Sequence, residues 1–177
     1  MARSLLGRRI GQEPRSIGFQ VSAHGKPHLI APCPVAFNVA HTCGLVVCAI
    51  GDSERLGVDV ESASRCVDTA LANRYFSGPE IEWLENQPSH CQSDAFLRIW
   101  TLKESFIKAV GTGLTMPLDR FAFGDIDSPV PRLTLLDAEH GPRTRWHSFL
   151  FQPQRDFITA ITVNSDMRPD VTLHPFG

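Results

Sequence analysis

The stretch Trp100-Thr101-Leu102-Lys103-Glu104-Ser105-Phe106-Ile107-Lys108 has the spacing of an amphipathic helix within this 177-residue chain. On a predicted helix over 95–110, residues four apart share a face, so Trp100, Glu104 and Lys108 form one stripe. A carboxylate and an ammonium group one turn apart suit phosphate chemistry. Taken alone, however, such a pair is more often an exposed ion pair worth about 0.3–0.5 kcal/mol. The core face beside the stripe is apolar and consists of Phe96, Ile99, Leu102, Phe106 and Val110.

A second group of acids lies upstream, in Gly57-Val58-Asp59-Val60-Glu61. A strand over these residues places Asp59 and Glu61 on one face. Alternating acids often form a solvated strand edge, but the apolar neighbours indicate a buried strand, in which carboxylates need a partner or a cation. Magnesium prefers oxygen ligands and bridges carboxylates to phosphates. We therefore predict a magnesium site formed by Asp59, Glu61 and Glu104, with Lys108 beside the leaving phosphate.

The composition is that of a soluble globular protein, with 42% hydrophobic and 20% charged residues. The net charge of -2 argues against a generic nucleic-acid binder. The five cysteines form no CxxC pair, which favours free thiols in a reducing compartment. Residues 1–10 contain no sustained apolar run. We expect a cytoplasmic protein that binds neither nucleic acid nor membrane.

Hydrophobic periodicity predicts a mixture of helices and strands, so the expected fold class is α+β. Three short apolar runs, at 37–41, 45–50 and 56–61, suggest an antiparallel meander with the second run central. Asp94 is the expected cap of the long helix, and Ser77 that of a helix over 77–84. Further helices are expected at 2–11 and 67–76, and further strands at 17–21, 132–136, 145–151 and 157–163.

Two other residues are candidates for phosphate contacts. His41 ends a predicted strand, although a lone histidine there is more often structural. Lys26 lies in the turn Gly25-Lys26-Pro27, where it either neutralises a phosphate or is an ordinary turn lysine.

Five motifs in this order resemble the 4'-phosphopantetheinyl transferase superfamily, and most closely its surfactin-synthetase (Sfp-like) branch. They are Gly25-Lys26-Pro27, Phe37-Asn38-Val39-Ala40-His41, Gly57-Val58-Asp59-Val60-Glu61, Arg74-Tyr75-Phe76-Ser77 and Trp100 to Lys108, followed by Gly111-Thr112-Gly113-Leu114 and Pro117-Leu118. The resemblance implies a pseudo-twofold pair of α/β lobes. It also implies Mg²⁺-dependent transfer of the phosphopantetheine arm of coenzyme A to a serine of an apo acyl, peptidyl or aryl carrier protein, with release of adenosine 3',5'-bisphosphate.

The resemblance also implies roles for single residues. Asp59, Glu61 and Glu104 correspond to metal ligands, and Glu104, or a water that it orients, would take the serine proton. Lys108 would assist the departing bisphosphate. Four further residues correspond to contacts rather than catalysts: Lys26 and His41 at coenzyme A phosphates, and Trp100 and Lys103 beside the catalytic stripe.

The chain also departs from the family pattern. Residues 1–54 match only the later part of the first lobe, and residues 55–177 form the second lobe with the magnesium site. Ala40 stands where the family usually has serine, a loss of one hydrogen bond worth about 0.5–1.5 kcal/mol. A mis-set start codon, a short enzyme that dimerises and an inactive remnant each explain the short lobe. The alternative functions are a non-catalytic coenzyme A or carrier-binding module and an unrelated magnesium-dependent phosphoesterase.

Overall fold

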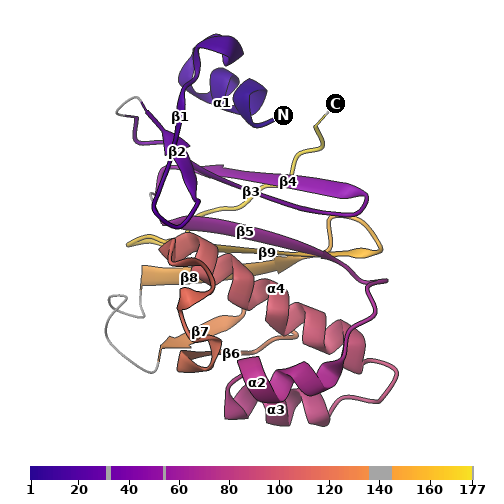
Figure 1. Cartoon of the computed structure of the whole chain (residues 1–177). Coiled ribbons are helices and arrows are strands. Elements are labelled where there is room, and N and C mark those ends of the chain that lie inside the picture. The colour runs from indigo at the N-terminus through magenta and orange to yellow at the C-terminus, as the bar shows by residue number, and fades with distance from the viewer. Residues whose placement is uncertain (31–32, 54, 136–144, 177) are drawn as a thin grey trace.

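The computed structural model describes residues 1–30, 33–53, 55–135 and 145–176, and the fold is α+β as predicted (Figure 1). One long helix, α4, lies across one face of a three-stranded sheet, and a smaller β-structure lies beyond the other side of that sheet. The expected boundary between the two lobes falls at residue 54, which lies outside the described ranges.

The long helix is α4 (Gln92–Val110), and it ends at Gly111, whose left-handed conformation (φ 86°) favours glycine. Between residues 99 and 109 every residue is buried except Trp100, Glu104 and Lys108. The predicted stripe is therefore the face of this half of the helix that remains open to a ligand.

The start of α4 differs from the prediction. The cap position is Cys91 rather than Asp94, and the helix begins one turn earlier than expected. Asp94 lies in the first turn, where its carboxylate pairs with Arg98 at 2.6 Å. An acid in the first turn is favourable to the helix dipole without being the cap.

The sheet under α4 has the strand order β5-β9-β8 and is antiparallel throughout. Its strands are β5 (Leu56–Ser62), β9 (Phe157–Asn164) and β8 (Trp146–Phe151). Helix and sheet approach closely at Gly57, where an added Cβ would lie 2.1 Å from the backbone oxygen of Ser105. Glycine at this position lets α4 lie directly on β5.

The N-terminal half consists of one helix and two hairpins. Leu6, Ile17 and Phe37 form its small buried core. Both the helix predicted at 2–11 and the strand predicted at 17–21 are present, the strand in shortened form. The elements are α1 (Ala2–Ile10), β1 (Phe19–Val21), β2 (Pro27–Leu29), β3 (Ala36–Thr42) and β4 (Leu45–Gly51).

The predicted meander is wrong in its third strand. β3 pairs with β4, but β5 pairs with β9 instead of joining them. The seam between the two sheets is the boundary between β3 and β5. The side chain of Asn38 crosses it, because its Oδ1 accepts a hydrogen bond from the Val58 amide at 2.8 Å. Nor is β4 a central strand: among the described strands it pairs with β3 alone, and Val46 on it is 51% exposed.

Most of the other predicted helices and strands are present, with changed bounds. The helix predicted at 67–76 is shorter than expected and consists of a 3-10 turn (Thr69–Leu71) followed directly by α2 (Ala72–Tyr75). Ser77 caps α3 (Gly78–Glu85) as predicted, with Glu80 completing a capping box. The strands predicted at 145–151 and 157–163 are confirmed as β8 and β9. The strand predicted at 132–136 is β7 (Arg132–Leu135), with residue 136 outside the described ranges, and it pairs with an unpredicted strand, β6 (Phe121–Gly124).

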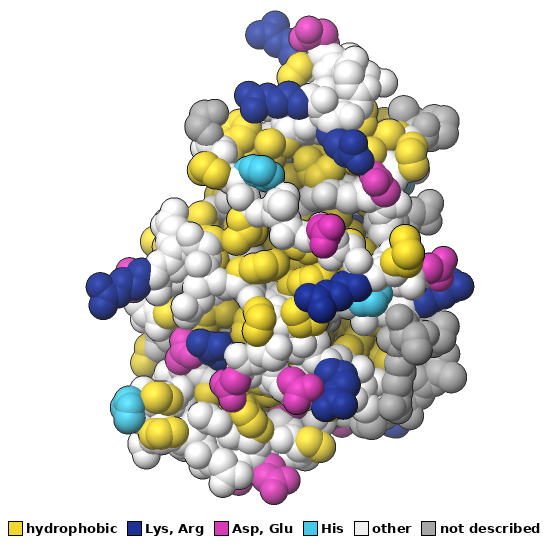
Figure 2. All heavy atoms as spheres, turned by 180° about the vertical axis from the view of Figure 1, so that it is seen from behind, with side chains coloured by type: hydrophobic (Ala, Val, Ile, Leu, Met, Phe, Trp, Pro, Cys, Tyr) yellow, Lys and Arg dark blue, Asp and Glu magenta, His cyan; other side chains and the backbone are white. Residues whose placement is uncertain are grey.

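Figure 2 shows the reverse face of the molecule, where apolar side chains gather over the middle and acidic and basic side chains are interspersed. No helix among the described ranges is both long and apolar enough to cross a bilayer.

Candidate active site

The centre of the candidate site is an ion pair between the sheet and α4. Lys108 Nζ donates to Asp59 Oδ1 at 2.6 Å, across the interface that Gly57 allows to be close. The Asp59 side chain is 9% exposed, and its other oxygen, Oδ2, is buried without a hydrogen-bond partner. Burial raises the pKa of Asp59, while the charge of Lys108 and its hydrogen bond act in the opposite direction.

Glu104 lies in the electrostatic field of the same group. Burial, together with the negative charges of Asp59 and Glu61, raises the pKa of Glu104 to about 7, and the charge of Lys108 opposes this rise. The predicted residues Asp59, Glu61, Glu104 and Lys108 are thus close enough to influence one another electrostatically. A carboxyl group with a pKa near 7 is suited to accept a proton at neutral pH.

Glu61 has a partner that the sequence did not suggest. Its Oε1 accepts a hydrogen bond from Arg65 at 2.6 Å, four residues further along the chain. The Glu61 side chain is only 13% exposed, whereas that of Arg65 is 50% exposed. Arg65 is therefore free to swing away from the carboxylate at modest cost.

Asp59, Glu61 and Glu104 are side chains of the type that bind a divalent cation, but their oxygens do not converge on one metal position. No group of three or more His, Cys, Asp or Glu side chains within the described ranges is arranged to hold a metal. Yet Asp59 Oδ2 is buried and unpaired, and Glu104 carries a charge that its surroundings disfavour. Both features leave excess negative potential that a divalent cation would neutralise.

Lys26 lies where β5 begins and α4 ends. Its Nζ donates to the carbonyl oxygens of Leu56 at 2.9 Å and Ala109 at 3.2 Å. An ammonium group has three donor hydrogens, so one remains for a phosphate oxygen. Burial lowers the pKa of Lys26 to about 8. The lysine thus closes the C-terminal turn of α4, which contains Lys108.

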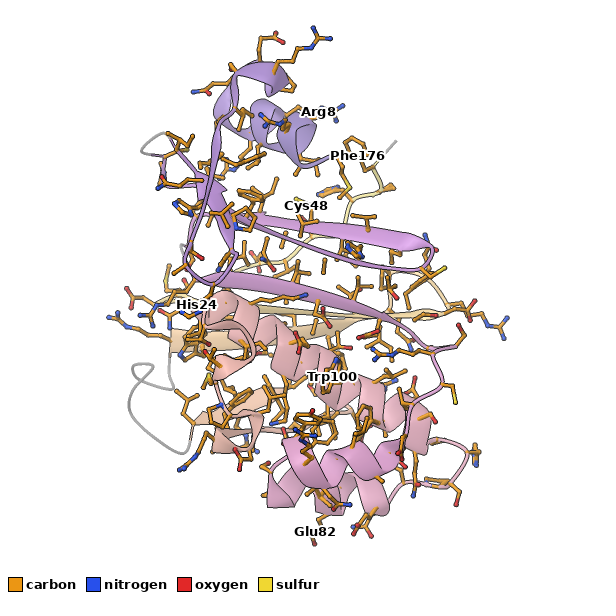
Figure 3. The ribbon with its side chains drawn as sticks, in the orientation of Figure 1. Arg8, His24, Cys48, Glu82, Trp100 and Phe176 are labelled. Atoms are coloured by element: carbon orange, nitrogen blue, oxygen red, sulfur yellow. The ribbon has the colours of Figure 1, made fainter. Side chains whose placement is uncertain are left out.

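The other two predicted contacts, His41 and Trp100, lie on the two elements that pack against β5. His41 is exposed near the end of β3, which runs beside β5 with Asn38 next to Val58. Trp100 is half-buried on α4 (Figure 3), stacked on Phe96 with centroids 6.1 Å apart. His41 therefore lies on the strand beside β5, and Trp100 lies on the helix that covers β5.

The structure contradicts a role for Lys103 in binding coenzyme A. Its side chain is fully buried, with Nζ 2.8 Å from Glu80 Oε2. The same Nζ donates to the carbonyl oxygens of Leu118 at 2.7 Å and Phe121 at 2.8 Å. These three partners use all three donor hydrogens of the ammonium group. Lys103 therefore joins α4 to α3 and to the segment before β6, and has no donor for a ligand.

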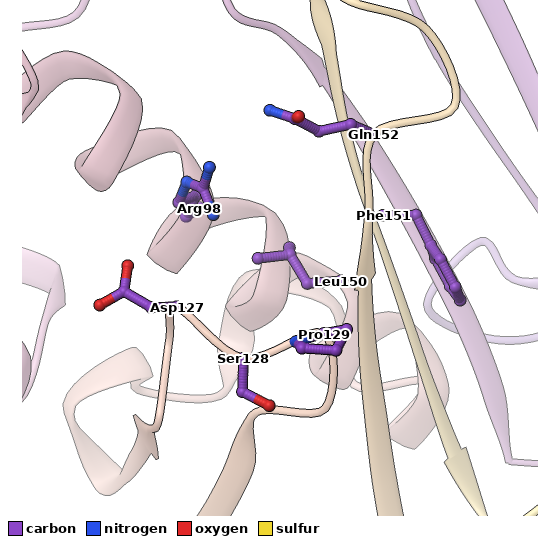
Figure 4. A pocket seen from close by; sticks show the side chains of 7 residues that line it. All are labelled: Arg98, Asp127, Ser128, Pro129, Leu150, Phe151 and Gln152. Atoms are coloured by element: carbon purple, nitrogen blue, oxygen red, sulfur yellow. The ribbon is translucent and has the colours of Figure 1, made fainter.

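A pocket of about 230 Å³ lies between α4 and the end of β8 (Figure 4). None of the predicted site residues lines it. Its walls come from α4, the β6–β7 connection and the end of β8: Arg98, Asp127, Ser128, Pro129, Leu150, Phe151 and Gln152.

Sequence reasoning missed three residues that shape the site. Arg65 follows Glu61 at a distance of four residues, which is a weak signal in a loop. Asn38 lies within the second of the five motifs, where nothing marks it as a contact between segments. Glu80 follows Ser77 at the serine–glutamate spacing of a capping box. The contacts of Asn38 and Glu80 join distant segments, so their roles depend on the tertiary fold.

Sequence comparisons with known proteins agree with the resemblance. The model of the 4'-phosphopantetheinyl transferase superfamily matches residues 55–162. A 4'-phosphopantetheinyl transferase of Bacillus subtilis is 37% identical over 123 residues, which are 69% of this chain and 54% of the relative. The transferase Sfp of B. subtilis strain 168 is 34% identical over 122 residues, again 69% and 54% of the two chains. The solved holo-[acyl-carrier-protein] synthase of Thermotoga maritima has a TM-score of 0.49 at 24% identity, over 63% of each chain.

The chain spans about half the length of the two curated relatives. The matched region, residues 55–162, is more than half of this chain and contains Asp59, Glu61, Glu104 and Lys108. The chain therefore belongs to the 4'-phosphopantetheinyl transferase superfamily.

Proposed function

We propose that the chain transfers the 4'-phosphopantetheine arm of coenzyme A to a serine of an apo carrier protein. The observation that carries the proposal is the Lys108–Asp59 pair at 2.6 Å beside Glu104, whose pKa is raised to about 7. A base, a cation and an unpaired carboxylate oxygen in one place suit phosphoryl transfer, which depends on positioning and charge neutralisation.

In this proposal the serine oxygen forms a bond to the phosphorus that carries the pantetheine arm. The bond from that phosphorus to the bridging oxygen breaks, and adenosine 3',5'-bisphosphate leaves. Glu104 accepts the serine proton, directly or through a water that it orients. Lys108 neutralises the charge that develops on the leaving phosphate, and Lys26 and His41 bind other phosphates of coenzyme A. Trp100 borders the same face.

Asp59, Glu61 and Glu104 would together hold Mg²⁺, with Glu61 released from Arg65. When bound, the ion would neutralise the pyrophosphate and lower the barrier to displacement. The buried, unpaired Oδ2 of Asp59 supports this assignment. We also infer a cytoplasmic location, since all five cysteines are free thiols.

Intact-protein mass spectrometry tests the function. The parent protein, incubated with coenzyme A, Mg²⁺ and an apo acyl carrier protein, should add the mass of one phosphopantetheine arm to the carrier, and EDTA should abolish the addition. Thermal stabilisation by coenzyme A with no mass change at high protein concentration would instead indicate a binding module of the same fold. Transfer that persists in EDTA would remove the metal assignment.

A further inference from the structure

A row of small side chains crosses the sheet directly beneath α4. Ser148 on β8, Thr162 on β9 and Gly57 on β5 lie opposite one another across the three strands. Thr162 Oγ1 is 3.0 Å from Ser148 Oγ and 2.7 Å from the Oγ of Ser105 on α4. The three hydroxyl-bearing residues are almost completely buried. They form a continuous hydrogen-bonded chain from the edge of the sheet to the helix.

The donors and acceptors in this row of hydroxyl groups can be ordered in only one way. The Ser105 hydroxyl donates its proton to the carbonyl oxygen of Leu102 at 2.7 Å. A hydroxyl group has a single proton, so Ser105 accepts from Thr162, and Thr162 accepts from Ser148. Hydrogen bonds in a buried chain are directional and reinforce one another. The apolar contacts around α4 are not directional and fix its rotation less strictly.

The row of hydrogen-bonded hydroxyl groups ends next to the candidate catalytic residues. Ser105 directly follows Glu104, and Gly57 precedes Asp59 by two positions on the same face of β5. The hydrogen bond from Thr162 to Ser105 therefore fixes the rotation of α4 on the sheet. That rotation determines where Glu104 and Lys108 lie relative to Asp59. On the other flank, Lys103 is fixed by its buried contacts to Glu80 and two carbonyl oxygens. Glu104 lies between two neighbours that are anchored in different elements.

We propose that Thr162 and Ser105 are positioning residues, which hold Glu104 and Lys108 in register with Asp59. Neither residue touches reacting atoms in this account. The inference rests on the proposed function, because its main consequence is a change in the transfer step. Small displacements of catalytic groups reduce the rate of chemistry more than they reduce substrate binding when part of the substrate binding comes from residues that do not lie on α4, here His41 on β3.

The sharpest test compares two isosteric substitutions on one strand. Thr162→Val removes the central hydroxyl, whereas Thr159→Val removes a buried hydroxyl that has no hydrogen-bond partner, on the opposite face of β9. We expect Thr162→Val to lower kcat by roughly ten- to a hundredfold, with the KM for coenzyme A changed by less than about twofold. Thr159→Val, and Thr162→Ser, which keeps the hydroxyl, should retain kcat within about twofold. Parental kcat in Thr162→Val, or an equal loss in Thr159→Val, would overturn the proposal.

A second readout does not depend on activity. Hydrogen exchange of the α4 amides should become faster in Thr162→Val and stay unchanged in Thr159→Val. Unchanged exchange in both variants would contradict the anchoring role. If the parent shows no transfer, the proposed function fails, while faster exchange in Thr162→Val alone still supports the anchoring of α4.

Discussion

Glu104 is the residue through which pH should act on the stability of the protein. Its pKa is raised from 4.5 to about 7 in the fold, so the native state holds the proton more tightly than the unfolded chain. The stability that this group contributes is therefore fully present below about pH 4.5 and is lost as the pH rises through about 7. Glu104→Gln removes this dependence, because glutamine stays neutral.

We predict that the melting temperature of Glu104→Gln, relative to the parent, rises between about pH 5 and pH 8 and then levels off. Thermal denaturation in metal-free buffer at a series of pH values measures this difference. A difference that is constant over the range, or that falls, would show that Glu104 has an ordinary pKa.

Lys26 leads to a prediction about ligand binding. Burial lowers its pKa to about 8, so the free protein loses this positive charge as the pH rises through that value. The affinity for coenzyme A should therefore weaken between about pH 7 and pH 9, and this loss should be smaller in Lys26→Arg, since arginine stays charged. Isothermal titration calorimetry of both proteins measures it. Equal pH dependence in the two would place Lys26 away from the phosphates.

The predictions for single residues succeeded where a local pattern was enough. Helical spacing alone placed Trp100, Glu104 and Lys108 on the one stripe of α4 that is not fully buried, and strand alternation placed Asp59 and Glu61 on one face of β5. Lys103 was misassigned because it is next to Glu104, which faces the site. The side chain of Lys103 itself points the other way and forms a buried ion pair with Glu80. That contact depends on how α3 folds back on α4, which the sequence spacing does not encode.

The contact between α4 and β5 depends on a single missing Cβ. In Gly57→Ala the new carbon would lie 2.1 Å from Ser105 O and 2.3 Å from Ala109 N, both of which are backbone atoms. The helix must shift, so we expect the free energy of unfolding to fall by about 1–3 kcal/mol or more, together with transfer activity. Chemical denaturation measures the stability. Gly124→Ala, a strand glycine with nothing within 4 Å, is the matched control. Equal stability of the two variants would contradict the close approach.

At the scale of elements, the boundaries of most helices and strands could be predicted, but their partners could not. β5 reads as the third strand of a meander because it follows β4 closely in the chain. Its actual partner, β9, is about a hundred residues away in the chain. The register that pairs Gly57 with Thr162 is favoured by the packing of α4 on the sheet and not by any local sequence signal. β6 was missed because Phe121–Gly124 is short and ends in glycine.

At the scale of the whole molecule, the seam between the two sheets determines where His41 lies relative to the carboxylates. Asn38 Oδ1 accepts from the buried Val58 amide, and Asn38→Ala would leave that donor unsatisfied, at a cost of about 1–3 kcal/mol. We expect a lower melting temperature and a severalfold higher KM for coenzyme A, with kcat less affected. Ile161→Val, which costs about 0.5–1.5 kcal/mol on the same side of the sheet, controls for instability. A KM that rises equally in both variants would show that the seam has no specific role.

We propose that the stripe of α4, which faces Asp59, carries out phosphopantetheine transfer. The most direct measurement is the rate of carrier modification, followed by intact-protein mass, for the parent, Glu104→Ala and Glu82→Ala. Glu82 is an exposed carboxylate on α3, at the far end of the molecule (Figure 3). We expect parental rates in Glu82→Ala and a loss of about a hundredfold or more in a folded Glu104→Ala. Transfer by Glu104→Ala at the parental rate would contradict it.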